Sequence, residues 1–122
     1  MANQLLKQLG LAVSAMSLIA CTQTDTKPME DRISRIEMEV EQADELDADE
    51  YAPVALREAR LNLDAAKQKI AAKKYGEARH SIDKAALEIE YAMMKTRSEK
   101  AQAAAEQLRL DMDTLRKEVN PS

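Results

Sequence analysis

The chain has 122 residues, of which 45% are hydrophobic and 33% charged, and its 22 Asp and Glu against 18 Lys and Arg give a formal net charge of −4. This balance argues against nucleic acid and against anionic lipid headgroups as the main partner, because both select for clustered Lys and Arg. Two glycines and three prolines among abundant Ala, Glu, Lys and Leu predict an all-α chain, whose core must be built from Leu, Ile, Met and Ala because Trp and Phe are missing.

The first 20 residues have the pattern of a secretory signal. Lys7 supplies a positive start, and the run from Leu9 to Ala20 is apolar apart from two serines. As a helix this run reaches only about 18 Å, well short of the ~30 Å hydrocarbon core of a bilayer. We therefore predict a removable signal peptide over residues 1–20.

The end of this segment, Leu18-Ile19-Ala20-Cys21, resembles the lipobox of bacterial lipoproteins. The resemblance implies cleavage before Cys21 and covalent lipid on its sulfur, whereas the alternative is an ordinary signal with an incidental cysteine. Cys21 is the only cysteine, so no disulfide or zinc site competes for it. Buried acyl carbons, as in palmitate, contribute about 0.8 kcal/mol each, so two or three chains give stable anchoring.

The residues after the cysteine bear on localisation. In lipoproteins of the enteric type an Asp at this place favours retention in the inner membrane, but Thr22 and Gln23 stand here. The resemblance therefore implies an outer-membrane protein, lipid-anchored and facing the periplasm. Residues 21–28 carry no periodicity and predict a flexible tether, and the helical domain is expected over residues 29–122.

Two helices are predicted in the first half of this domain. The first, over about residues 29–47, carries an apolar stripe at three- and four-residue spacing made of Ile33, Ile36, Val40 and Ala43. Pro53 suits the first position of a second helix, which extends to about residue 72. Val54, Leu61 and Ala65 lie beside its main apolar face. That wide face predicts packing against two neighbours.

A third, long helix is predicted over residues 77–120. Lys73 and Lys74 complement the negative end of the preceding helix, and Gly76 is expected to relax the backbone of the turn. An inner seam of the helix comprises Ala78, Ile82, Ala85, Ala86, Ile89, Ala92 and Met93. A polar break is expected at residues 96–100. A second seam with coiled-coil spacing follows at Ala101, Ala105, Leu108, Met112, Leu115 and Val119.

Two arrangements satisfy these stripes. In the favoured one, three helices pack up, down and up, with Leu46 opposite Val54, Val40 opposite Leu61 and Ile36 opposite Ala65, and the end of the third helix has no internal partner. In the alternative, the first two helices run nearly end to end and form one long antiparallel hairpin with the third. A contact between Ile36 and Met112 would identify that hairpin.

A family resemblance supports the helical interpretation. The segments Tyr51–Ala59 and Lys73–Arg79, with Leu63, Ala66, Ala85 and Ala86, resemble the bacterial lipoprotein family catalogued as domain of unknown function 4398. The resemblance covers roughly residues 33–92 and implies a lipoprotein signal followed by a short helical domain. Some members continue into an OmpA-like peptidoglycan-binding domain, which is not expected here. The turn is also similar to one tetratricopeptide hairpin.

Three groups of residues resemble metal sites, and each has a simpler interpretation. The acidic stretch 44–50 lacks the Gly and the distal Glu of a calcium loop, so we expect a solvated loop. His80, near Glu77 and Asp83, is expected at a solvated helix position. The methionines are expected to fill the core, although a copper(I) site is the other interpretation of Met93, Met94 and Met112.

These observations predict a protein without catalytic, metal or cofactor-binding residues, apart from the covalent lipid on Cys21. No nucleic acid and no small-molecule ligand is expected. The membrane, through the lipid anchor, and a protein partner or a second copy of the chain are the expected partners, with the seam Ala101–Val119 as the interaction surface. The alternative function is a structural one, through contact with peptidoglycan or lipopolysaccharide.

Overall fold

The computed structural model describes residues 25–120, and the predicted signal, Cys21 and residues 22–24 of the predicted tether lie outside this range. The described chain forms α1 (Lys27–Glu45), α2 (Ala48–Tyr51), α3 (Pro53–Ala71) and α4 (Tyr75–Val119), with no strand among these residues. The all-α prediction is therefore confirmed. α1 takes in Lys27 and Pro28, which the sequence pattern assigned to the tether.

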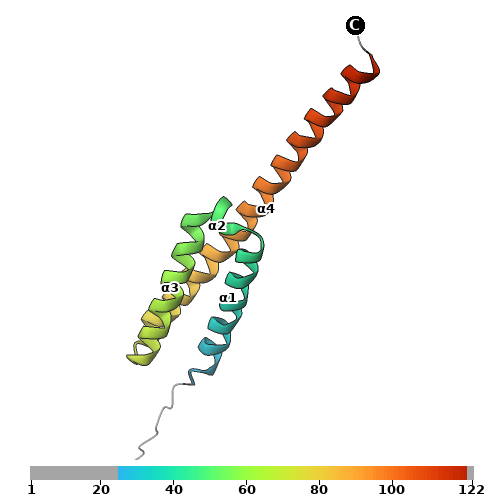
Figure 1. Cartoon of the computed structure of the whole chain (residues 1–122). Coiled ribbons are helices and arrows are strands. Elements are labelled where there is room, and N and C mark those ends of the chain that lie inside the picture. The colour runs from blue at the N-terminus through green and yellow to red at the C-terminus, as the bar shows by residue number, and fades with distance from the viewer. Residues whose placement is uncertain (1–24, 121–122) are drawn as a thin grey trace, which may run out of the picture.

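α1, α3 and α4 run up, down and up as a three-helix bundle (Figure 1). An ion pair of 2.7 Å between Arg32 and Asp83 fixes the start of α1 beside the first part of α4. α3 runs antiparallel to α1, because Lys67 binds Glu37 at 2.6 Å and Arg60 binds Asp44 nearer the other end. The long antiparallel hairpin is wrong, since it would place Arg32 far along α4.

The core lies chiefly between α3 and α4, and α1 closes it. The predicted inner seam of α4 is buried, with Ile82 and Ile89 fully inaccessible to solvent. Alanines at 59 and 66 of α3 and at 78, 85 and 92 of α4 are also fully buried, so the two helices approach closely. Such short side chains leave a thin core in which each Leu and Ile contributes much of the buried apolar area.

Of the predicted second stripe of α3, Val54 and Leu61 are exposed and Ala65 is partly buried. Val54 and Leu61 are 62% and 55% exposed, so the predicted pairs of Leu46 with Val54 and of Val40 with Leu61 are wrong. α1 contacts α3 instead through ion pairs at the edge of the bundle, and it directs its buried residues at 29, 33 and 36 into the common core. Apolar spacing identified a helix here, but it did not identify which apolar residues are covered.

The α3–α4 turn is closed by Lys73 and not by glycine. Lys73 has a left-handed backbone with φ of 59°, and its N–H bonds the Ile70 carbonyl at 2.9 Å while the Lys74 N–H bonds the Lys69 carbonyl at 2.8 Å. This is the Schellman pattern of helix ends. Gly76 has no positive φ and lies in the first turn of α4, so its predicted role in the turn is wrong.

A second left-handed residue, Asp47 with φ of 63°, joins α1 to α2. The corner is held on α4 by Lys100, whose Nζ donates to the Leu46 carbonyl at 2.8 Å and to Asp47 Oδ2 at 2.6 Å and lies 5.7 Å from the centre of the Tyr51 ring. The Asp47 carboxylate raises the pKa of Lys100 through this hydrogen bond. The predicted loop thus contains a short helix that is fastened to α4.

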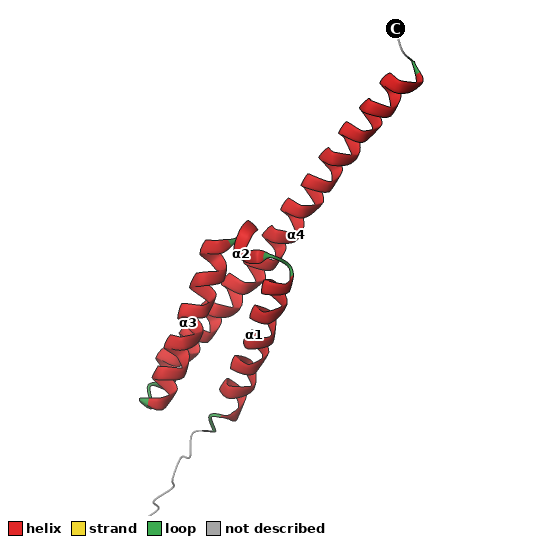
Figure 2. Cartoon of the chain, in the orientation of Figure 1, coloured by secondary structure: helices red, strands yellow, loops and turns green. Residues whose placement is uncertain are grey.

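α4 has 45 residues, about 66 Å at ~1.5 Å per residue, and extends well past the other helices (Figure 2). From Arg97 to Asn120 every residue is exposed except Lys100 and Asp113, which are partly buried. We call residues 101–119 the projecting segment. Among the described residues, no helix combines the length and the apolar character needed to cross a membrane.

Candidate interaction surface

The six residues predicted as an interaction surface lie on the projecting segment. Ala101 and Ala105 are exposed, and the exposed fractions of Leu108, Met112 and Leu115 are 61%, 58% and 59%. Val119, at the end of the helix, is 76% exposed. No described residue outside α4 covers these side chains. Their spacing therefore predicted correctly a seam without an internal partner.

Polar contacts within the segment support the helix. Arg109 binds Glu106 at 2.8 Å and lies 3.9 Å from Asp113, so it bridges three successive turns. The hydrogen bond from Arg109 lowers the pKa of Glu106. Gln107 also donates to Asp111 at 2.8 Å. Such i,i+3 and i,i+4 pairs each contribute about 0.2–0.5 kcal/mol, which helps an isolated helix but cannot bury its apolar side chains.

The exposed seam begins further back along α4 than the sequence pattern alone predicted. Counting back from Ala101 by alternating three and four residues gives Ser98, Met94, Tyr91 and Leu87, and all four are exposed. Together with the six predicted residues they form what we call the α4 stripe. The polar character of residues 96–100 hid the extension, and the unbroken heptad spacing was the signal that could have found it.

The α4 stripe lies on the side of the helix that faces away from the bundle. Leu87 is two positions from both Ala85 and Ile89, and at about 100° per residue it is rotated by about 200° from the buried seam. Accordingly Leu87, Tyr91 and Met94 are 67%, 55% and 58% exposed, although the same turns of α4 are packed against α3. One helix thus carries two apolar seams, of which only the inner one is covered.

Shallow grooves border this outer seam. One, of about 490 Å³, lies between α1 and α4 and is lined by Glu39, Gln42, Glu90, Met94 and Arg97 among others. Another, of about 260 Å³, lies where the start of α3 meets α4 at Tyr91 and Lys95. Both are open to solvent and neither brings catalytic groups together. Met94 lines the first of these grooves and Tyr91 the second, and both line a third of about 270 Å³.

The residues that resembled metal sites are engaged otherwise. In the acidic stretch, Asp44 binds Arg60 and Asp47 binds Lys100, while beside the exposed His80 the Asp83 carboxylate binds Arg32. No three His, Cys, Asp or Glu side chains gather into a group that could hold a metal ion within residues 25–120.

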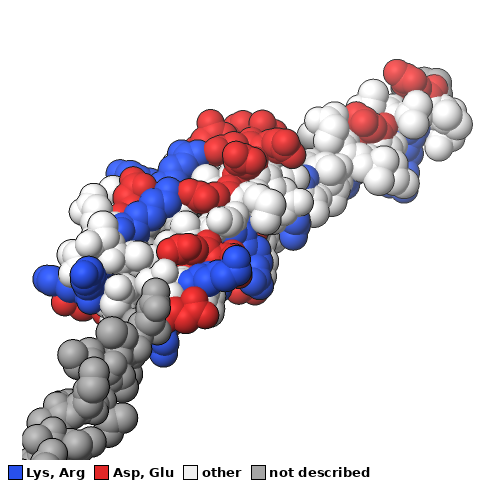
Figure 3. Space-filling model, turned by 90° about the horizontal axis from the view of Figure 1, so that it is seen from below, with Lys and Arg blue, Asp and Glu red and all other residues white. Residues whose placement is uncertain are grey.

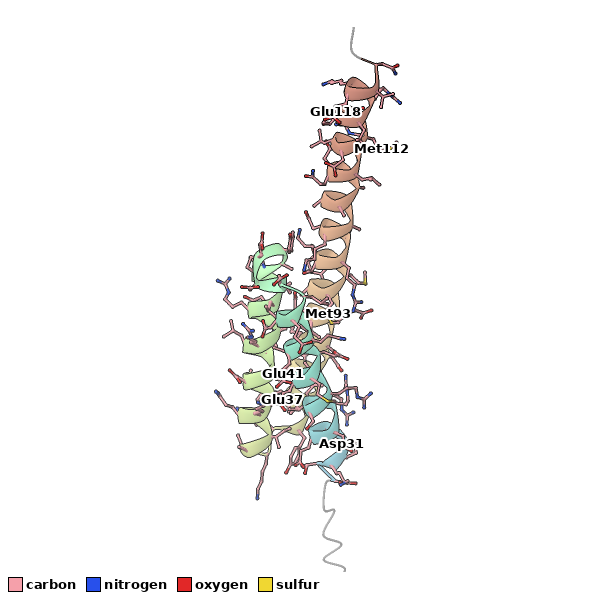
Figure 4. The ribbon with its side chains drawn as sticks, turned by 45° about the vertical axis from the view of Figure 1, so that its right-hand side comes forward. Asp31, Glu37, Glu41, Met93, Met112 and Glu118 are labelled. Atoms are coloured by element: carbon pink, nitrogen blue, oxygen red, sulfur yellow. The ribbon has the colours of Figure 1, made fainter. Side chains whose placement is uncertain are left out.

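Of the three methionines expected to fill the core, only Met93 is buried, whereas Met94 and Met112 are each 58% exposed. Met93 is buried within the bundle and Met112 lies far up the projecting segment (Figure 4), so the copper(I) interpretation has no geometric support.

Charges on the bundle are mixed. Lys and Arg are interspersed with Asp and Glu on the face seen in Figure 3, whereas uncharged side chains dominate the visible part of the projecting segment. This face shows no broad cationic patch of the kind that binds nucleic acid. The visible part of the projecting segment is therefore less charged than the bundle on this face.

The comparisons with known proteins concern the whole domain. A family model described as "Domain of unknown function (DUF4398)" matches residues 33–108. This range includes most of the bundle and the projecting segment as far as Leu108, and it confirms the family resemblance seen in the sequence. No curated protein and no solved structure matches the chain.

Proposed function

Since the chain belongs to the DUF4398 family, whose description assigns no activity, we propose its function from its own residues. It is a non-catalytic outer-membrane lipoprotein, anchored through lipid on Cys21 and facing the periplasm, that binds a protein partner or associates with itself through α4. One observation carries the second half of this proposal. Apolar side chains at coiled-coil spacing are exposed on a helix that extends beyond its own bundle.

The physical argument concerns what such a helix needs. Most helical stability in proteins comes from packing an apolar face against a neighbour. In the projecting segment Leu108, Met112 and Leu115 are each more than half exposed. Covering them with a second helix removes apolar surface from water, a gain of roughly 25 cal/mol per Å² buried.

The anchoring half of the proposal rests on the lipobox resemblance around Cys21. We expect the full chain, produced in bacteria fed labelled palmitate, to take up label and to fractionate with the outer membrane. Cys21→Ser should lose both the label and the membrane fractionation. An unlabelled wild-type chain would contradict the lipoprotein assignment.

The binding half is tested by placing two cations on the α4 stripe. Leu108→Lys with Met112→Lys should abolish the capture of any protein by a photo-crosslinking residue at Leu115 in living cells, because charged side chains do not enter a helix seam. Ala103→Lys with Leu110→Lys is the matched control. It adds the same charge to the same segment on another face and should leave capture intact. Equal capture by both variants would contradict the proposal.

A further inference from the structure

Resting on the proposed function, we infer that the partner of α4 is a second copy of this chain, paired in parallel and in register along the whole α4 stripe from Leu87 to Val119. The stripe is longer than the projecting segment alone, since residues 87–119 span about 48 Å at ~1.5 Å per residue. It amounts to between four and five heptads. Sustained repeats of that length are typical of coiled coils.

In such a dimer, side chains of the same size meet at each level of the seam. Alternate positions of the stripe place Leu87, Met94, Leu108 and Leu115 at the d positions of a heptad, with alanine at residue 101. The a positions are Tyr91, Ser98, Ala105, Met112 and Val119. In a parallel dimer each residue meets its own copy, so large side chains meet at both ends while the small ones meet in the middle. The helices can therefore approach closely at their centre.

The charges that flank the stripe specify the orientation. In a parallel dimer each g residue faces the e residue five positions on in the other copy. Glu90 then faces Lys95, and Asp111 faces Arg116, and symmetry makes each pair twice. The other two g–e′ combinations, at 97 with 102 and at 104 with 109, contain an uncharged partner. Within the stripe no like charges meet.

An antiparallel pairing of the same length would bring like charges together. Full overlap would place residue 87 opposite residue 119, and the flanking contacts would then join g to g and e to e. Lys95 would face Arg109 and Glu90 would face Glu118, which are like-charged pairs. They offset the two pairs of opposite charge in that arrangement, Glu88 with Arg116 and Arg97 with Asp111. Since flanking charges select orientation in coiled coils, the parallel form is favoured.

The bundle leaves room for this partner. The buried seam of α4 carries α1 and α3, and the stripe lies about 200° around the helix from it, so two copies can meet back to back with their bundles outside. Glu90 and Arg97 border the groove beside α1, while Lys95 borders the groove beside the start of α3. Glu90 and Arg97 are thus exposed at the rim of the stripe, where the second helix would lie, and Lys95, which binds Glu99 of its own helix at 2.6 Å, is partly exposed there.

Disulfide trapping of the full chain in bacterial cells tests the inference. Ala105→Cys places a thiol in the seam, and Ala103→Cys places one on another face of the same exposed turn. Mild oxidation should give about tenfold more covalent dimer for Ala105→Cys, because a disulfide needs Cα atoms within about 7 Å. The unsubstituted chain reports any dimer formed through Cys21. Equal dimer for both variants, or none for Ala105→Cys, overturns the inference.

Orientation is tested with Leu87→Cys and Val119→Cys chains that carry tags of different size and are produced together. Parallel pairing gives covalent dimers of like variants, whereas mixed dimers would establish antiparallel pairing and overturn the inference. Photo-crosslinking at Leu115 separates this result from the proposed function. If Ala105→Cys gives no dimer while Leu115 captures a different envelope protein, the second copy is excluded and the proposed function stands. If Ala105→Cys gives no dimer and Leu115 captures no protein, the second copy and the proposed binding function are both wrong.

Discussion

Two residues adopt backbone conformations that their side chains disfavour. Lys73 and Asp47 are left-handed, with φ of 59° and 63°, and each follows the end of a long helix. For residues other than glycine this region costs roughly 1–2 kcal/mol, because Cβ crowds the following carbonyl. At Asp47 the carboxylate accepts a hydrogen bond from Lys100, which offsets the cost. Lys73 lies exposed at the tip of the α3–α4 turn, so its cost is retained.

We therefore expect Lys73→Gly to raise the free energy of unfolding by about 1 kcal/mol, because glycine adopts this conformation without strain. Chemical denaturation of the full chain measures the change. Lys74→Gly is the matched control, since it removes the same charge from the next residue, whose φ is −91°. That control should destabilise the protein slightly. If both variants gained stability, charge and not backbone strain would be responsible.

At the scale of elements, the corner formed by α1 and α2 depends on one side chain from α4. Lys100 donates to the backbone at Leu46 and to the side chain of Asp47, and it marks the point where α4 leaves the bundle. Beyond it α4 extends past the other described helices (Figure 1), and its side chains are exposed apart from the partly buried Asp113. The same residue therefore fastens the corner and defines where the projecting segment begins.

Lys100→Met should keep the length of the side chain and loosen this corner, which we expect to appear as faster amide hydrogen exchange over residues 46–52 and a lower Tm. Lys117→Met is the control, since Lys117 is exposed on α4, outside the α4 stripe and away from the corner. Because the folded-state pKa of Lys100 is raised above 10.5, its contribution is present at neutral pH and is lost as the pH rises through that pKa. Unchanged exchange at the corner in Lys100→Met would contradict this role.

The three long helices were predictable because each carries an apolar repeat of helical period, and Pro53 opens α3 as expected. α2 was not predictable, since a helix of four residues is too short to show an apolar repeat. Thr96 was predicted in a polar break but is fully buried, and its hydroxyl donates to the Ala92 carbonyl at 2.8 Å. Periodicity shows that a helix has apolar stripes, but which stripe becomes buried depends on tertiary packing. Val54 and Leu61, for example, belong to an apolar stripe that stays exposed.

At the scale of the whole molecule, the exposed apolar seam of α4 was partly predictable. The six residues of the projecting segment followed from their spacing, whereas the extension back to Leu87 required knowing which face of α4 the bundle covers. Once that face is known, the stripe, its flanking charges and its orientation form one consistent pattern. The flanking charges therefore predict how substitutions change dimerisation.

Asp111→Arg should weaken dimerisation, because it places two cations side by side, and adding Arg116→Asp should restore it by reversing the pair. Sedimentation or size-exclusion of the full chain measures both steps. The double exchange distinguishes the orientations. In an antiparallel dimer the cation introduced at position 111 would face Arg97, and the anion introduced at position 116 would face Glu88, so association would weaken further. No rescue by the second substitution would therefore contradict parallel pairing.

The projecting segment extends past the rest of the described fold (Figure 1), and this separates two kinds of constraint along a single helix. Substitutions of the buried residues before Lys100 are limited by the need to fold. Those after it are limited only by helix propensity and by whatever the segment binds. Partner choice can thus diverge among related chains without a compensating change in the bundle, and sequence drift after residue 100 would report binding specificity in isolation from folding.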